Sequence, residues 1–173
     1  MTDQQEVRRL SARVLVIDEG GRVLLFGFRE KAGEAAADEE PGWCTPGGGV
    51  EPGESLAEAA ARELREETGL VLSAEALGGM VAETSGYADL GWAEGVFRDV
   101  FFHCRVAAYD VDVSGLEGVE LAFHAGHRWW PVKELEEFIE GGGTVYPYGL
   151  PALVRELVAG RVPAEPVRLE WPH

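Results

Sequence analysis

The order of strand-like and helix-like segments predicts an α/β fold, specifically an α/β/α sandwich around a mixed central β-sheet. Segments rich in Val, Leu and Ile alternate with segments whose apolar residues recur at helical spacing, which is typical of layered domains. The chain has 173 residues, within the range of one domain, and no repeat or linker divides it. We therefore expect a single domain over residues 1–173, with a flexible loop at 29–42 and an extended tail at 161–173.

The expected elements begin with a β-hairpin and end with a helix. Two β-rich segments, 9–18 and 23–28, are joined by a Gly-Gly pair, which is a hairpin signal. Ser55 followed by Glu58 forms a capping box, and Gly69 provides a stop signal, so we expect a helix between them. The other expected strands are 71–83, 99–109 and 128–131, and the other expected helices are 132–140 and 151–158.

Acidic residues outnumber basic residues by 31 to 15, which gives a formal net charge of −16. A surface this negative repels phosphate backbones, so we exclude bulk nucleic acid as a partner. The first ten residues are polar and the apolar runs are too short to span a bilayer, so we expect no signal sequence and no membrane anchor. Cys44 and Cys104 lack paired spacing, which indicates reduced thiols and a cytoplasmic protein.

A cluster of carboxylates lies in the middle of the chain. Its members are Glu51, Glu54, Glu58, Glu63, Glu66 and Glu67. The last three stand at i, i+3 and i+4, so they share one face of the expected helix and repel one another. Arg62 can neutralise one of them, whereas a hard cation such as Mg²⁺ would neutralise the others beside the glycine-rich segment upstream. The alternative is an ordinary solvated helix face, and the spacing of the residues favours the metal site.

That spacing follows the pattern G-x5-E-x7-R-E-U-x-E-E-x-G-U, where U is a bulky aliphatic residue, from Gly48 to Leu70 without a departure. The segment resembles the signature of the Nudix hydrolases, the MutT-like family. More weakly, residues 128–131 and the helix after them are similar to the C-terminal part of many members. The resemblance implies a Nudix α/β/α sandwich with a loop-helix-loop catalytic motif. It also implies that metal-activated water cleaves a pyrophosphate bond in a nucleoside diphosphate linked to another moiety, with Mg²⁺ or, as a substitute, Mn²⁺.

The resemblance also implies roles for individual residues. The implied metal-binding groups are the carboxylates of Glu63, Glu66 and Glu67 and the carbonyl of Gly47. Arg62 would orient the glutamates, and Glu54 would brace the loop against the helix, so both would support catalysis. Glu66 is the first candidate for the general base, and Glu120 and Glu94 are the alternative bases.

The substrate is predicted only as a class, a small nucleotide. A tyrosine in the region of Tyr87 resembles the dinucleoside-polyphosphate hydrolases, but a simple nucleotide or a nucleotide sugar stays open. The aromatic residues that could stack on a base are Phe28, Trp43, Tyr87, Trp92 and Phe97. The basic residues that could contact phosphate are Arg98, Arg29 and Lys31. Dimers are common among relatives, so a homodimer is also considered.

Two other functions are open alternatives. A nucleotide-binding sensor that has kept the fold without the reaction would be marked by broken glutamates, and none is missing here. An isoprenoid diphosphate isomerase of Nudix fold would require a catalytic cysteine, for which Cys44 is the candidate. His124 and His127 are three residues apart, but no cysteine or second pair accompanies them, so we do not expect zinc.

Overall fold

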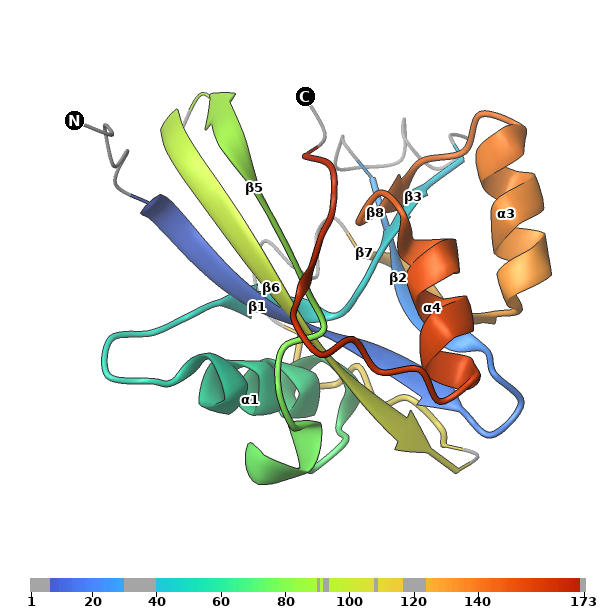
Figure 1. The fold of residues 1–173 in the computed structure, drawn as a ribbon, viewed down its shortest axis with the longest axis horizontal. Helices are drawn as coiled ribbons and strands as arrows, with labels where there is room; N and C mark the ends of the chain where they lie inside the picture. Colours follow the sequence, from blue (N-terminus) through green and yellow to red (C-terminus); the bar gives the residue numbers. More distant parts are fainter. Residues whose placement is uncertain are drawn as a thin grey trace.

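The computed structural model describes residues 7–29, 40–89, 91, 94–107, 109–116 and 124–171, with the side chain of Arg8 excepted. Three of the residues considered above, Lys31, Trp92 and Glu120, lie outside the described residues, as does most of the loop expected at 29–42. Within the described part, a nine-stranded mixed sheet lies between helix α1 on one side and helices α3 and α4 on the other (Figure 1).

The strands are β1 (Val7–Asp18), β2 (Val23–Phe28), β3 (Gly42–Cys44), β4 (Gly47–Gly49), β5 (Ala82–Asp89), β6 (Glu94–Val106), β7 (His124–Trp130), β8 (Val145–Tyr146) and β9 (Val167–Arg168). Their order along the sheet is β8-β3-β2-β1-β6-β5-β9, while β4 pairs with β1 and β7 with β2. The pairs β1 with β6, β3 with β8 and β5 with β9 are parallel, and the other pairs are antiparallel. The predicted mixed sheet is therefore observed.

The central strand β1 is shared by three neighbours. One edge of β1 pairs with β6 from Val7 to Asp18. The other edge pairs with β4 at residues 11–13 and with β2 at Ile17. The sheet therefore divides along this second edge, and the glycines of β4 lie beside residues 11–13 of β1.

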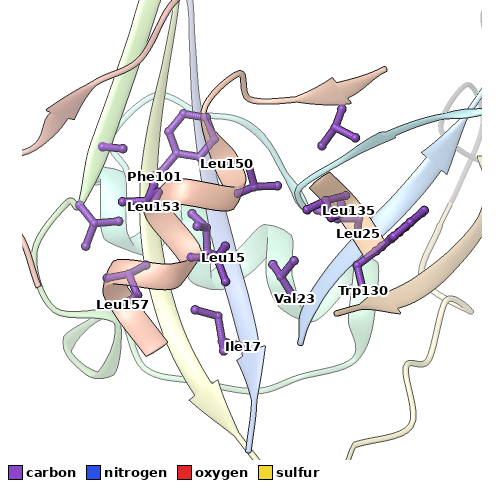
Figure 2. Packing of buried hydrophobic residues seen from close by; sticks show 14 residues of the cluster. Leu15, Ile17, Val23, Leu25, Phe101, Trp130, Leu135, Leu150, Leu153 and Leu157 are labelled. Carbon is purple, nitrogen blue, oxygen red and sulfur yellow. The ribbon is translucent and has the colours of Figure 1, made fainter. Parts of the chain in front are cut away.

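Alternation along β1 builds two cores, one on each face of the sheet. Leu15 and Ile17 point to the core covered by α3 (Val132–Glu140) and α4 (Leu150–Val158), as Figure 2 shows. Val14 and Val16 point to the core covered by α1 (Leu56–Thr68). Because both faces are buried, the strand is apolar along most of its length instead of alternating with polar residues.

The strand bounds expected at 71–83 and 99–109 require correction. The strand expected at 71–83 begins only at Ala82, because residues before it form a 3-10 turn, η2 (Glu75–Leu77), in which Ser73 caps the amide of Ala76. The strand expected at 99–109 begins at Glu94. The glycine-rich segment before the helix includes strand β4, and the tail expected to be extended includes strand β9, which pairs with β5.

The helix predictions are confirmed to within one residue at each end. None of the helices in the described ranges has the length and apolar character needed to cross a membrane.

Candidate active site

Helix α1 presents two of its glutamates inward. Ser55 caps the helix by accepting a hydrogen bond from the amide of Glu58, and the Glu58 carboxylate accepts one from the amide of Ser55. Ala60 and Leu64 enter the core beneath β1. Because Ala60 and Leu64 face the core, Glu63 and Glu67 also lie on the buried side of the helix, with only 7% and 9% of their surface exposed. Two carboxylates are thus held at i and i+4 beside strand β4.

The glycines of β4 leave space for these carboxylates beside the main chain. The amide of Gly47 donates a hydrogen bond of 2.8 Å to Oε2 of Glu67. A Cβ atom on Gly48 would lie 2.6 Å from the carboxyl carbon of Glu63, so the glutamate occupies the space of a side chain. Gly47 also has φ of 146°, in the region that favours glycine. The sequence pattern requires glycine here because a carboxylate approaches the main chain closely.

Arg62 joins the glycine loop to the glutamates. Its guanidinium donates to both carboxylate oxygens of Glu54 at 2.8 and 2.9 Å and to the carbonyl of Gly49 at 2.9 Å. It also donates to Glu63 at 3.0 Å and to Glu66 at 3.3 Å. The hydrogen bond with Glu54 is the main reason why the pKa of Arg62 is raised, although burial lowers it. Conversely, the hydrogen bond from Arg62 is the main reason why the pKa of Glu54 falls to about 2.

The three candidate metal-binding glutamates have different environments. Glu66 is 46% exposed at its side chain and contacts Arg62, whereas Glu63 and Glu67 are buried. In the described part of the chain, no three His, Cys, Asp or Glu side chains form a group placed to hold a metal ion. The donor chemistry nevertheless fits a hard divalent cation, because carboxylate oxygens converge on a glycine strand that leaves space for them.

An arginine and an aspartate on the central strands also belong to this region, and the sequence analysis missed both. Nε of Arg13 lies 3.6 Å from Oδ2 of Asp99, and the guanidinium donates to the carbonyl of Thr45 at 3.2 Å. Burial lowers the pKa of Arg13, but the nearby carboxylates of Asp99, Glu67 and Glu63 and the Cys44 thiol raise it overall. The available signal was a charged residue within an apolar central strand, where an unpaired charge would be costly.

Comparison with known proteins agrees with this geometry. The NUDIX domain family model matches residues 7–149. The chain belongs to the Nudix family. An RNA pyrophosphohydrolase of Bradyrhizobium diazoefficiens is 32% identical over 157 residues, covering 85% of this chain and 88% of that protein.

Solved structures show the same Nudix fold. A MutT protein from Methanosarcina mazei superimposes with a TM-score of 0.56 and 25% identity, covering 88% of this chain and 94% of that one. An Ap4A hydrolase complex from C. elegans has a TM-score of 0.56 and 17% identity, covering 88% and 96%, so this likeness concerns the fold alone. The predicted family, the α/β (α+β) Nudix fold and the class of Nudix pyrophosphohydrolase enzymes are confirmed.

The predicted substrate residues of the Nudix chain lie in two separate places. Phe28, at the end of β2, stacks on Tyr146 with 5.9 Å between ring centroids, and Tyr146 in turn contacts Tyr148 at 5.5 Å. Arg29 follows Phe28 directly and is half-buried. The tyrosines were missed because they lie about 120 residues from Phe28 in the sequence and reach it only through strand β8. Trp43 packs against Trp130 in the core beneath α3 and α4.

The other predicted substrate residues lie on the β5 and β6 hairpin. The hydroxyl of Tyr87 donates to Glu94, one of the two alternative bases, and this hydrogen bond is the main reason why the pKa of Tyr87 is raised. Arg98 forms an ion pair of 2.7 Å with Glu83, which lowers the pKa of Glu83. These side chains bond to each other across the hairpin, whereas the motif glutamates lie against β4.

His124 and His127 share an aromatic neighbour, and Cys44 and Cys104 are not bonded to each other. His124 and His127 lie against Phe26 with ring centroids 5.4 and 6.3 Å apart, and burial lowers the pKa of His124. Both cysteines are free thiols. Burial raises the pKa of Cys44 to about 11 and that of Cys104 to about 12, so both are protonated at neutral pH.

Proposed function

We propose that this protein is a Mg²⁺-dependent Nudix hydrolase that cleaves a pyrophosphate bond in a nucleoside diphosphate linked to another moiety. One observation supports this most strongly: Glu63 and Glu67 are buried against β4, where Glu63 occupies the side-chain space of Gly48 and Glu67 accepts a hydrogen bond from the Gly47 amide. Burying two like charges side by side is costly for the fold alone, and a divalent cation would offset that cost.

Some motif residues would bind the metal ion, and others would hold the metal-binding side chains in place. Glu63, Glu66 and Glu67, with the carbonyl of Gly47, would hold Mg²⁺ or its substitute Mn²⁺. A bound divalent cation would lower the pKa of water and offset the charge of the phosphates. Arg62 would keep the carboxylates in place, and its bidentate bond to Glu54 would fix the loop before the helix.

Glu66 is the preferred general base among the acids considered. Its side chain is 46% exposed, so it can reach a water molecule that the buried glutamates cannot. Glu94 already accepts a hydrogen bond from Tyr87, which makes it the weaker candidate.

The proposed substrate is a small nucleotide, with Phe28 beside the base and Arg29 beside a phosphate. The relative named as an RNA pyrophosphohydrolase makes an RNA end a second substrate to test. The net charge of −16 favours the small nucleotide, because an RNA body would find few basic residues to hold it. We further propose that residues 1–173 act as one cytoplasmic domain, with a homodimer as the form to be checked.

The test compares the parent protein with Glu67→Gln on a panel of nucleotides, dinucleoside polyphosphates, nucleotide sugars and a short RNA with a 5′ polyphosphate. Released phosphate or mononucleotide is measured with and without Mg²⁺. We expect Glu67→Gln to lower turnover by at least about 10²-fold, because a lost metal ligand removes several kcal/mol of charge stabilisation. Glu137→Gln is the matched control, since Glu137 is an exposed helix glutamate away from the motif.

Equal turnover by parent and Glu67→Gln on every substrate would contradict the proposal. Nucleotide-dependent thermal stabilisation without any product would instead indicate a sensor. Isomerisation of isopentenyl diphosphate that depends on Cys44 would indicate the isomerase, although a thiol with a pKa of about 11 is poorly suited to that role.

A further inference from the structure

The C-terminal tail ends on the sheet with an aromatic side chain. Strand β9 pairs with β5, and the amides of Val167 and Leu169 donate to the carbonyls of Val81 and Glu83 at 2.9 and 2.8 Å. The hydroxyl of Thr84 donates to the carbonyl of Glu170 at 3.1 Å. Trp171 follows Glu170 directly, and its indole lies against Gly86 and Tyr87 of β5.

The indole occupies a notch with three features. It fills the space where a Cβ of Gly86 would lie, so a side chain at that position would exclude the indole. It stacks on the ring of Phe97 with centroids 6.4 Å apart and planes 18° from parallel. Its ring nitrogen donates a hydrogen bond of 3.2 Å to the carbonyl of Tyr87. We call the site made by Gly86, Phe97 and the Tyr87 carbonyl the Gly86 notch.

These features are the ones that recognise a purine. A purine is a flat fused bicycle like indole, it stacks on aromatic rings, and its amino or ring N–H groups donate to carbonyls. We propose that the Gly86 notch is a purine-binding site that the chain's own Trp171 occupies. The choice of a purine rests on the proposed nucleotide substrate, whereas the notch itself rests on the contacts above.

The notch opens on the face of the sheet that also carries Arg13. Phe97 and Asp99 are two residues apart on β6, so they share a face and are separated by about 7 Å along the strand. Asp99 pairs with Arg13 at 3.6 Å, and Arg13 packs under Gly47, which bonds to Glu67. The Asp99–Arg13 pair therefore lies between the notch and the motif glutamates, where the phosphates of a nucleotide bound at the notch could reach it.

The tail meets the sheet through a short strand at its edge, the two residues of β9. Both residues of β9 are exposed, and Trp171 itself is half-buried near the end of the chain. A tethered side chain nevertheless competes at an effective concentration of about millimolar, so it would mask the notch from dilute ligand. Removing the indole should therefore unmask the site.

The experiment measures binding of adenosine and guanosine, without phosphate or divalent cation, by calorimetry to the full-length chain and its variants. We expect Trp171→Ala to bind at least one purine nucleoside about tenfold or more tightly than the parent. Arg168→Ala is the matched control on the same tail, because its side chain is exposed and pairs with the Glu83 carboxylate; it should leave affinity unchanged. Uridine, with one ring, should gain less.

A second substitution tests the notch directly. Adding Gly86→Ala to Trp171→Ala places a methyl group in the notch and should abolish the gain in affinity. If the alanine variant melts too early for calorimetry, Trp171→Phe keeps the stack and loses the N–H donor, and a smaller gain is expected. A folded Trp171→Ala variant with parental affinity, or a gain that survives Gly86→Ala, would overturn the proposal. Neither binding result depends on hydrolysis, so failure of the purine site can be distinguished from failure of the proposed reaction.

Discussion

Two arginines flank the glycine strand, and they are placed by different means. Arg62 bonds to Glu54, Glu63 and Glu66, all within eight residues of it in the sequence. Arg13 pairs with Asp99, which is 86 positions away and reaches it only because β1 and β6 run side by side. Arg62 contacts its carboxylates at 2.8–3.3 Å, whereas the Arg13 pair spans 3.6 Å. The first cluster is a local motif and the second is a product of the fold.

The two arginines hold the glycine loop from opposite sides. Arg62 holds the carbonyl of Gly49 from the helix side. Arg13 holds the carbonyl of Thr45 from the sheet side. Between these two contacts lies Gly47, whose amide holds Glu67. Each arginine can therefore be removed separately to ask which side of the loop matters more.

The largest effect is expected from Arg62→Ala. Removal of the guanidinium leaves Glu54, Glu63 and Glu66 without their shared partner. Because Arg62 and Glu63 are largely shielded from solvent, we expect the loss of stability to exceed the roughly 1 kcal/mol or less that an exposed ion pair contributes. Urea unfolding should show this loss of stability. Arg62→Lys keeps the positive charge but cannot form the two parallel hydrogen bonds of a guanidinium, so it should recover only part of the lost stability. Arg65 is an exposed arginine of the same helix. If Arg62→Ala lowered the free energy of unfolding no more than Arg65→Ala, Arg62 would not stabilise the fold through these three glutamates.

Removing the sheet-side arginine should have a smaller effect on stability and a clear effect on catalysis. Arg13→Met preserves most of the side-chain volume but frees the Thr45 carbonyl and Asp99. We expect about a tenfold fall in the proposed turnover, as for other residues that orient a ligand through a second group. Steady-state kinetics and Mg²⁺ titration of Arg13→Met, Asp99→Asn and the double variant measure this. Fully additive effects would show that the two residues act independently.

The helix-side cluster should also be sensitive to acid. Hydrogen bonds from Arg62 and then from the Glu51 amide hold the pKa of Glu54 at about 2, below its ordinary value of 4.5. A depressed pKa means that the folded state favours the ionised form, so this contribution is present above about pH 4.5 and is lost as pH falls towards about 2. Unfolding midpoints of the parent and Glu54→Gln should converge over that range. Parallel curves would show that Glu54 does not titrate this way.

The smallest expected effect is on the reactivity of Cys44, which lies beside Arg13. Burial raises its pKa to about 11 although Arg13 lowers it, so the thiol should react slowly with iodoacetamide at neutral pH. The alkylation rate should rise steeply only as pH approaches about 11. Cys44→Ser separates its signal from that of Cys104. A fast reaction of Cys44 at neutral pH would mean that the electrostatic influence of Arg13 exceeds that of burial.

Local spacing predicted the helix-side half of the site. The capping box of Ser55 and Glu58, the helix end at Gly69 and the shared face of Glu63, Glu66 and Glu67 follow from residues within a few turns of each other. The burial of Glu63 and Glu67 and the exposure of Glu66 were not predicted, because they depend on how α1 packs against the sheet. The hairpin of β1 and β2 and the other two helices were predicted for the same reason. The turn at Glu75–Leu77 was mistaken for strand because its apolar residues show no clear period.

The sequence by itself therefore determined the helix, its caps, the glutamate face and the family, because these depend on interactions between near neighbours. Only the tertiary structure decided that Arg13 meets Asp99, that Phe28 meets Tyr146 and that Trp171 reaches the Gly86 notch. Each of those contacts joins residues about 80 to 120 positions apart. Strand pairing and register bring them together, and a single sequence contains no local pattern that specifies which distant strands pair.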